Sequence, residues 1–254
     1  MTGALYLKDS YLKECEAIVK AVKEERYVVL DKTIFYPKGG GQPCDTGKLI
    51  TVSGLEFRVL EATKKDGEIL HEIEPQEQDA RLTTQDTRLK TGDRVKCVLD
   101  WARRYKLMRM HTAAHVFAGT LNSQLNALIT GNQLDVDKTR FDFDLENFDR
   151  ETFNEFVKKT NGLLQQDIEL RIYYLPREEA MNIPGVVKLA AALPPSISEL
   201  RIVDIPGIDI QADGGTHVKN LKEVGQIELL KLENKGKNNR RIYFTLTELS
   251  TTTG

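Results

Sequence analysis

Short hydrophobic or alternating runs, separated by turn-forming residues, dominate the first hundred positions of the chain. Runs of this kind between Gly, Asp, Pro or Ser residues predict β-strands. The predicted strands are Tyr27–Leu30, Leu49–Val52, Phe57–Leu60, Ile69–Ile73 and Val95–Leu99. Residues 11–23 fit either a helix or a strand, and we interpret them as a strand from residue 16. Several short strands in succession predict a small β-barrel, with the polar stretch Glu74–Gly92 as a loop on its surface.

The hydrophobic period changes after Trp101. Side chains at spacings of three and four then form one face of a helix, which we predict from Arg103 to Asn122. The residues on this face are Leu107, His111, Ala114, His115, Ala118 and Leu121. The change of period predicts a domain boundary near residue 100, with a barrel domain at 1–100 and a second domain at 101–254.

The remainder of the chain mixes strands with one further helix. Phe148–Gln165 has helical spacing. The predicted strands are Thr139–Phe143, Ile168–Tyr174, Leu200–Ile205, Ile227–Leu232 and Ile242–Leu246. Because strands and helices do not alternate regularly, we predict an α+β domain with helices on one face of a largely antiparallel sheet.

Composition fits a soluble globular protein rather than a disordered or membrane protein. The chain has 254 residues, of which 40% are hydrophobic and 29% are charged, enough for two modest domains. No leader peptide or membrane-spanning run is expected. The three cysteines, Cys15, Cys44 and Cys97, are scattered and odd in number, which favours a reducing, cytoplasmic setting.

The net charge of −2 provides no overall positive field to attract nucleic acid. Any such contact must therefore come from local basic clusters, although most clusters are only solvated faces. The first cluster contains Arg103, Arg104, Lys106 and Arg109, and the second contains Lys235, Lys237, Arg240 and Arg241.

Two of the four histidines lie four residues apart, in His111-Thr112-Ala113-Ala114-His115. This spacing puts both rings on one face of the helix, where they can reach one metal ion. Two hydrogen-bonded core histidines are the alternative, but the pair shares a stripe with hydrophobic residues, where an unpaired ring is costly. Metalloproteases with two histidines at this spacing carry a glutamate after the first one. Thr112 occupies that position here, which argues against a protease.

A third histidine follows in Asp213-Gly214-Gly215-Thr216-His217. Zinc accepts histidine nitrogen and carboxylate oxygen, and a catalytic site usually keeps three protein ligands and one open position. His111, His115 and His217 would supply these three ligands, with Asp213 as an optional fourth. The two glycines would permit a close backbone approach. Taken alone, this segment could also be an ordinary loop.

Several ordered motifs together resemble the editing domain shared by alanyl-tRNA synthetases and their free-standing relatives. They are the two histidine segments with Val218 and Glu223-Val224-Gly225, the segment Asp137–Phe143, and Lys235–Arg241. Residues 27–47, with Phe35–Pro43 and Asp45-Thr46-Gly47, look like the glycine-rich motif of the medium-length AlaX group. The resemblance covers nearly the whole chain. No aminoacylation motif or ATP site is visible beside it.

The resemblance implies an N-terminal barrel of the translation-factor type, one zinc ion per chain, and hydrolysis of Ser-tRNA(Ala) and Gly-tRNA(Ala). The four residues His111, His115, Asp213 and His217 would hold the metal and carry the hydrolysis. Residues of the glycine-rich motif would place the acylated 3′ end, with Thr33 near the amino acid side chain, and basic residues would contact phosphates. The substrate-binding residues expected on this basis are Thr33, Gly39, Gly40, Gly41, Gln42, Lys237, Arg240 and Arg241.

The wider family most often has cysteine at the position of Asp213, so this carboxylate is either a weak ligand or a neighbour of the metal. His71 lies outside all motifs, and we expect it at the surface without a role. The sequence leaves two other functions open, a small-molecule metallohydrolase with the same histidines and a zinc-stabilised RNA-binding module. It also leaves open whether zinc activates water, polarises the ester or orients the substrate, and whether the chain is a monomer or a homodimer.

Overall fold

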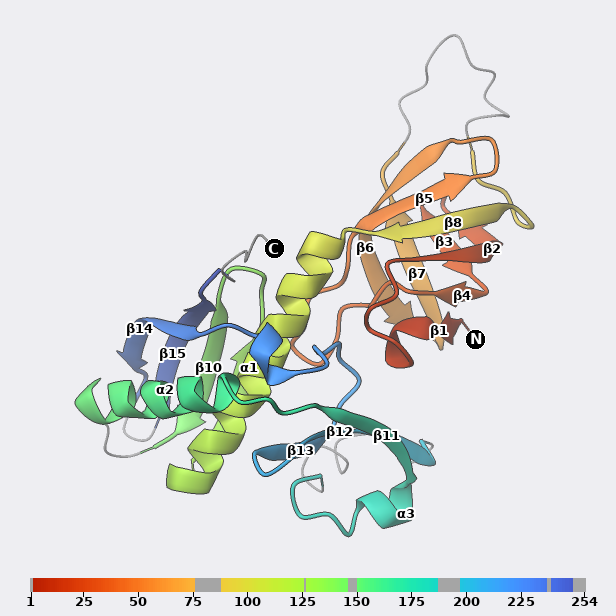
Figure 1. The fold of residues 1–254 in the computed structure, drawn as a ribbon. Coiled ribbons are helices and arrows are strands. Elements are labelled where there is room, and N and C mark those ends of the chain that lie inside the picture. Colours follow the sequence, from red (N-terminus) through yellow and green to blue (C-terminus); the bar gives the residue numbers. More distant parts are fainter. Residues whose placement is uncertain are drawn as a thin grey trace. The chain divides into compact units, whose positions relative to one another are not determined.

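The computed structural model divides into two compact units, Met1–Lys106 and Leu107–Gly254 (Figure 1). The residues that the structure describes are 2–75, 88–125, 127–145, 150–186, 197–236 and 239–248. The units divide inside helix α1 (Trp101–Leu125), a few residues after the boundary expected from the sequence. No helix in the described ranges is long and apolar enough to span a membrane.

The first unit is built on a closed barrel of antiparallel strands in the order β2-β3-β7-β6-β5-β8. These strands are β2 (Glu14–Lys23), β3 (Tyr27–Leu30), β5 (Gly47–Thr51), β6 (Glu56–Lys65), β7 (Glu68–Ile73) and β8 (Arg94–Leu99). Beside them, β1 (Gly3–Ala4) pairs in parallel with β4 (Lys32–Thr33), and a 3₁₀ turn covers Leu5–Leu7. The predicted barrel is confirmed, including the strand interpretation of residues 16–23. Its likeness to translation factors stays a prediction.

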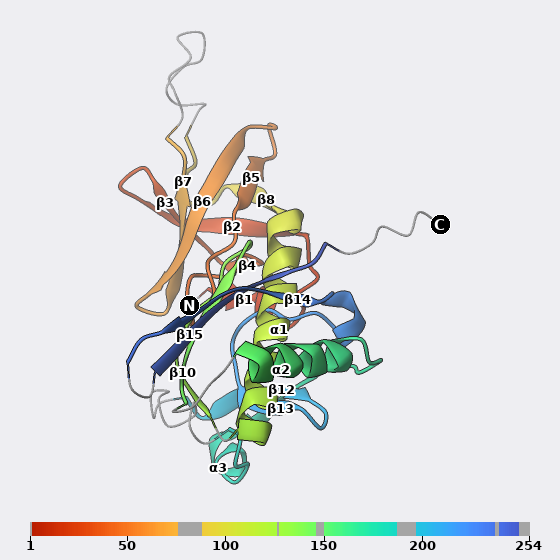
Figure 2. The same ribbon diagram turned by 90° about the vertical axis from the view of Figure 1, so that its left-hand side faces the viewer.

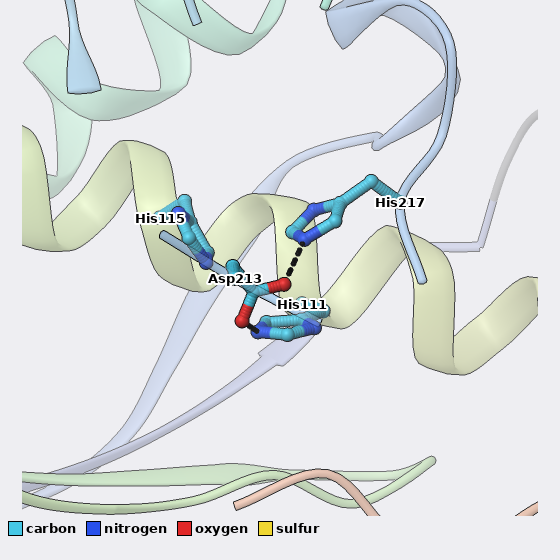
Figure 3. A group of neighbouring side chains, drawn as sticks. All are labelled: His111, His115, Asp213 and His217. Carbon is cyan, nitrogen blue, oxygen red and sulfur yellow. Dashed lines mark hydrogen bonds and ion pairs between the residues drawn. The ribbon is translucent and has the colours of Figure 1, made fainter. Parts of the chain in front are cut away.

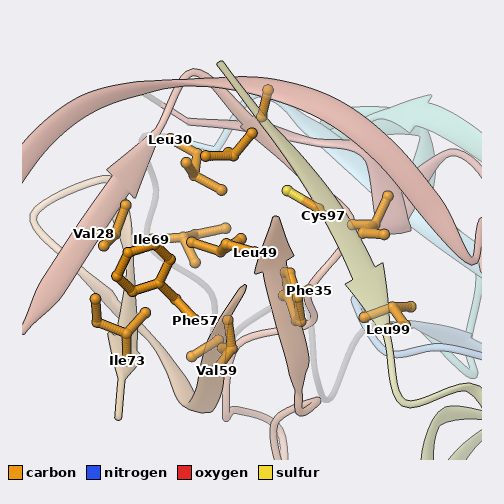
Figure 4. Close-up of a cluster of buried hydrophobic side chains, with 14 of the residues drawn as sticks. Val28, Leu30, Phe35, Leu49, Phe57, Val59, Ile69, Ile73, Cys97 and Leu99 are labelled. Carbon is orange, nitrogen blue, oxygen red and sulfur yellow. The ribbon is translucent and has the colours of Figure 1, made fainter. Parts of the chain in front are cut away.

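Alternation along the strands explains why the barrel closes. In β8 the side chains of Val95, Cys97 and Leu99 are buried, while those of Arg94 and Lys96 are exposed. The inward residues of neighbouring strands meet in one hydrophobic cluster (Figure 4). Closure pairs every strand on both sides, so no hydrogen-bonding edge is left open.

A buried ion pair joins the start of α1 to the glycine-rich segment within the first unit. Arg104 and Asp45 are both fully buried. The Arg104 Nε donates to the two Asp45 oxygens at 2.9 and 3.0 Å, and its terminal nitrogens donate to the carbonyls of Ser10 at 2.8 Å and Ile34 at 2.6 Å. Asp45 also accepts the backbone N–H of Tyr36 at 2.6 Å, which closes the segment between residues 36 and 45. This network satisfies a charge that would otherwise be costly to bury.

Two of the four residues in the first basic cluster, Arg104 and Arg109, are therefore buried rather than part of a basic surface. Arg109, 5% exposed, donates to the carbonyls of Val224 at 2.9 Å and Thr247 at 2.7 Å. Arg103 donates to the carbonyl of Cys44 at 3.2 Å. Sequence spacing does not reveal such partners, because they lie 59 to 138 residues away along the chain.

The described residues of the second unit form two antiparallel sheets rather than the single sheet expected. The strands of the first, in the order β14-β15-β10-β9, are β14 (Ile227–Asn234), β15 (Asn239–Leu246), β10 (Thr139–Asp144) and β9 (Leu128–Gln133). The strands of the second, in the order β11-β12-β13, are β11 (Arg171–Pro176), β12 (Glu199–Ile205) and β13 (Asp209–Ala212). The helices are α2 (Arg150–Leu164), the short α3 (Arg177–Ala180) and a 3₁₀ turn at Leu221–Glu223. Strands β9 and β13 were not predicted from the sequence.

Helix α1 runs through the core of this unit, where α2 crosses it (Figure 2). Every residue from Leu107 to Phe117 is buried. The ring of Phe117 packs against Phe156 of α2 and Phe244 of β15, with ring centroids 5.2 and 5.6 Å apart. Because α1 is enclosed on all sides here, its polar side chains must find partners inside the protein.

Candidate metal centre

Three histidines and one carboxylate converge in the second unit (Figure 3). His111 and His115 project from adjacent turns of α1, and Asp213 and His217 come from the segment after β13. The possible ligand atoms of the four residues all lie within 4.8 Å of one another. The structure thus brings together the four residues that the sequence singled out, and such a group can hold a metal ion.

The three imidazole rings pack against one another around the Asp213 carboxylate. Ring centroids lie 4.4 Å apart for His111 and His217, 4.8 Å for His115 and His217, and 5.0 Å for His111 and His115. One Asp213 oxygen lies 3.0 Å from His217 Nε2, and the other lies 3.7 Å from His111 Nε2. The mutual closeness of their possible ligand atoms distinguishes this group from separate core histidines.

Gly215 is required by the close approach of its backbone to His111. A Cβ atom at this position would lie 2.2 Å from His111 Cε1 and 2.4 Å from Nδ1. The Gly215 N–H also donates to Asp213 Oδ2 at 2.6 Å. The expected close approach thus occurs at Gly215, whereas a Cβ at Gly214 would meet no atom within 4 Å.

Burial and mutual contact favour the neutral form of the His111 and His217 rings beside an ionised carboxylate. Burial lowers the pKa of His217 to about 4 and holds the pKa of His111 well below its ordinary value. Burial alone would raise the pKa of Asp213, but the charge of His111 when that ring is protonated, together with the hydrogen bond from His217, outweighs burial and holds that pKa well below its usual range. Neutral imidazole nitrogens and a carboxylate oxygen are donors that a divalent metal accepts.

Thr112 and Asp209 contact the outer nitrogens of two of the rings. Thr112 Oγ1 lies 3.2 Å from His217 Nδ1 and accepts the Val218 N–H at 3.3 Å. Asp209 Oδ2 lies 2.8 Å from His115 Nδ1. Burial lowers the pKa of His115, but the hydrogen bond and charge of Asp209 more than offset it and the pKa is raised. The sequence revealed neither contact. Thr112 served there only as evidence against a protease, and Asp209 lies in no motif.

A pocket of about 790 Å³ opens beside this group, within the second unit. His111 and His115 form part of its wall, together with residues of β9 and of the stretch from Asp204 to Gln211. The two strands that the sequence did not predict therefore shape the space around the histidines.

Comparison with known proteins identifies the family. The alanyl-tRNA editing protein AlaX-M of Methanosarcina acetivorans is 49% identical over 248 residues, which cover 97% of this chain and 99% of the relative. AlaX-M of Saccharolobus solfataricus is 49% identical over 247 residues, with coverage of 97% and 99%. The chain belongs to the AlaX-M family of alanyl-tRNA editing proteins.

More distant matches connect this chain to synthetases. The family described as "Threonyl and Alanyl tRNA synthetase second additional domain" matches residues 200–243, and that described as "tRNA synthetases class II (A)" matches residues 7–103. The alanine–tRNA ligase of Methanobrevibacter smithii is 35% identical over 250 residues, which cover 96% of this chain but 27% of the ligase. The resemblance inferred from the motifs is confirmed.

Thr33 and His71 lie together in the barrel unit. Both are fully buried, so the surface position expected for His71 is wrong. His71 Nδ1 lies 2.9 Å from the Val28 carbonyl and must donate to it, so His71 Nε2 accepts the Thr33 hydroxyl at 2.8 Å. Thr33 Oγ1 also accepts the Phe35 N–H at 3.1 Å. Burial lowers the pKa of His71 to about 4, which keeps the ring neutral.

The glycine-rich segment forms a tight turn whose backbone requires glycine. Gly39 and Gln42 exchange backbone hydrogen bonds of 3.2 and 2.9 Å. Gly40 and Gly41 have φ angles of 56° and 85°, in the left-handed region. The three glycines are exposed, whereas Gln42 is buried. The turn alone accounts for two of the glycines, and a contact of this segment with substrate stays a proposal.

The second basic cluster is largely paired within the protein. Arg240 donates to Asn234 Oδ1 at 2.9 Å and to the Gly236 carbonyl at 2.7 Å. Arg241 binds the Asp142 carboxylate with two nitrogens, and Lys235 lies 2.9 Å from Glu233. Lys237 lies outside the described residues. The expectation that Arg240 and Arg241 contact tRNA phosphates must therefore compete with these internal bonds.

Proposed function

We propose that this chain hydrolyses the ester bond between a wrongly attached serine or glycine and tRNA(Ala), at one zinc ion held by the four clustered residues. The observation that carries this proposal is the buried convergence of His111, His115, His217 and Asp213, beside a pocket whose wall includes His111 and His115. Membership in a family of alanyl-tRNA editing proteins supports the choice of substrate.

The residues present fit zinc in number and chemistry. Zinc accepts imidazole nitrogen and carboxylate oxygen, and three ligands leave a position open for water or substrate. When bound, the ion would lower the pKa of a coordinated water to about 7 or polarise the ester carbonyl. Asp213 either completes the ligand set or holds a water near it, since its two oxygens face His111 and His217.

The pocket has room for more than an amino acid side chain. Its volume of about 790 Å³ lies in the range of roughly 300–1,000 Å³ that is usual for small-molecule sites. An aminoacyl ester with the terminal sugar of the tRNA would fit there. Polar residues of β9 and β13, among them Thr130, Asn132 and Gln211, face this space and could bind hydroxyl groups.

The direct test is to incubate the protein with Ser-tRNA(Ala), Gly-tRNA(Ala) and Ala-tRNA(Ala) and to follow deacylation. We expect the serine ester to be hydrolysed at least about tenfold faster than the alanine ester, because a site that binds a hydroxyl leaves its partner unpaired when the hydroxyl is missing. Hydrolysis of Ala-tRNA(Ala) at the rate of Ser-tRNA(Ala) would contradict editing. Cleavage of simple esters without action on charged tRNA would indicate a small-molecule hydrolase. Binding of charged tRNA without deacylation would indicate an RNA-binding module.

The role of Asp213 can be separated by two substitutions. If it is a ligand, Asp213→Ala should lower zinc affinity by roughly 10-fold or more, while Asp213→Cys should keep the metal because zinc favours thiolate. Affinity is measured by competition with a chelator, with Asp167→Ala as a control at an exposed carboxylate that pairs with Lys222. Normal zinc binding with lost hydrolysis in Asp213→Ala would instead give Asp213 a role with water or substrate.

A further inference from the structure

Asp209 makes a buried contact with one of the three clustered histidines. Its Oδ2 lies 2.8 Å from His115 Nδ1, and the side chains of Asp209 and His115 are only 11% and 7% exposed. Asp209 is the first residue of β13, whereas His115 lies in α1, so the contact joins a strand to the helix across 94 residues of sequence.

The chemistry of this contact fixes which nitrogen of His115 carries the proton. The Asp209 oxygen accepts a hydrogen bond, so the His115 Nδ1 that faces it carries a proton, and in the neutral form of the ring this leaves Nε2 without one. The lone pair is then on Nε2, the nitrogen left for the side of the ring that meets His111, His217 and Asp213. The opposite tautomer would place a proton where a metal ligand needs a lone pair.

Asp209 is itself held in place by its neighbour on the same face of β13. Gln211 Nε2 lies 3.1 Å from Asp209 Oδ1 and 2.9 Å from Oδ2. Residues i and i+2 of a strand project to the same side, which allows this contact. The carboxylate is thus restrained from both sides, by the amide of Gln211 and by the ring of His115.

A glycine in α1 gives Asp209 the room to approach. Gly119 lies one helical turn after His115, and a Cβ atom there would lie 2.5 Å from the Ile208 carbonyl oxygen and 3.0 Å from Asp209 Cβ. The nearest obstacle is backbone, which cannot move aside without shifting the start of β13. Asp209 can therefore take its position only because Gly119 has no side chain.

We propose that Asp209 is a positioning residue that sets the tautomer and orientation of His115, so that Nε2 is presented to the metal. This rests on the proposed function, because it takes His115 as a ligand. Outer hydrogen-bond partners of metal-binding histidines typically contribute 10- to 100-fold in metal affinity.

The first experiment measures the zinc affinity of metal-free protein by chelator competition for the wild type, Asp209→Asn and Asp209→Ala. Both variants should bind zinc about 10- to 100-fold more weakly. Asp204→Asn, which makes the same change at another carboxylate of the pocket wall, should leave zinc affinity within about twofold, because Asp209 acts through the ring. Equal weakening in Asp204→Asn and Asp209→Asn would reduce the effect to the loss of a negative charge and overturn the proposal.

A spectroscopic readout separates positioning from general support of the fold. In metal-free wild-type protein, ¹⁵N NMR of the imidazole nitrogens should show His115 protonated at Nδ1. Asp209→Asn and Asp209→Ala should lose this preference. An unchanged His115 tautomer in these variants would overturn the assignment, even if zinc affinity fell.

A matched pair of glycine variants tests whether position 119 must lack a side chain. Gly119→Ala should weaken zinc binding like the Asp209 variants, because the added methyl group displaces the start of β13. Gly162→Ala is the control, since a Cβ at Gly162 in α2 meets no atom within 4 Å. Normal zinc affinity in Gly119→Ala would contradict the arrangement.

Failure of this inference is distinguishable from failure of the proposed function. If the wild type binds no zinc, the proposed metal site is wrong, while the NMR spectrum still decides whether Asp209 fixes the ring. If the wild type binds zinc and the Asp209 variants bind it equally well, the metal site stands and the inference is wrong.

Discussion

Replacing His111 by alanine is expected to abolish the deacylation of Ser-tRNA(Ala) and to remove zinc from the purified protein. The substitution deletes one of three nitrogen donors and leaves His115, His217 and Asp213 with a gap where the ring was. Metal polarisation of a substrate is worth several kcal/mol, and each 1.36 kcal/mol is a tenfold change in rate. We therefore expect the rate of deacylation to fall by at least about a hundredfold to a thousandfold. Single-turnover deacylation measures this rate, and the zinc content of the purified variant is measured beside it.

The buried histidine outside the cluster provides the control for this substitution. His71→Ala removes an equally enclosed imidazole from the barrel, so it should lower stability but leave about one zinc per chain. Thermal unfolding of both variants checks that they are folded. Full activity of His111→Ala without zinc would contradict the proposed centre.

Breaking the buried Asp45–Arg104 pair is expected to lower the free energy of unfolding more than any of the other substitutions described above. Asp45→Ala would leave the fully buried Arg104 guanidinium without a counter-charge, which typically costs about 3–5 kcal/mol. It would also remove the acceptor of the Tyr36 N–H and so loosen the closure of the glycine-rich segment. The single tryptophan, Trp101, stacks on Tyr105 within the same unit, so its fluorescence in a urea titration should report the change.

The control is an ion pair on the outside of the same barrel. Lys48→Ala breaks the exposed pair with Glu56 and should change the free energy of unfolding far less, because solvent screens that pair. Equal losses in the free energy of unfolding for Asp45→Ala and Lys48→Ala would contradict the expectation that breaking the buried pair costs more.

Local pattern determined most of the secondary structure of this protein. The alternation that buries Val95, Cys97 and Leu99 and the helical spacing from Leu107 to Leu121 reflect faces that each element must bury. The segments around His111 and His217 indicated metal-binding chemistry because few residue types bind metals and their spacing was distinctive. Strands β9 and β13 escaped prediction because polar residues and Gly131 interrupt one, and the other is only four residues long.

Only the tertiary structure decided which polar residues are buried and which residues they contact. Arg104 looked like part of a basic surface and His71 like a surface residue, yet each is buried against partners that are distant in sequence. Asp209 carried no signal, because its contact with His115 depends on the close packing of β13 against α1 at Gly119. The sequence by itself determined which elements form and which side chains carry metal-binding chemistry, since both follow from residue type and local spacing. Only the fold decided which charges are enclosed and which nitrogen of each ring is left for a metal, since these depend on long-range contacts.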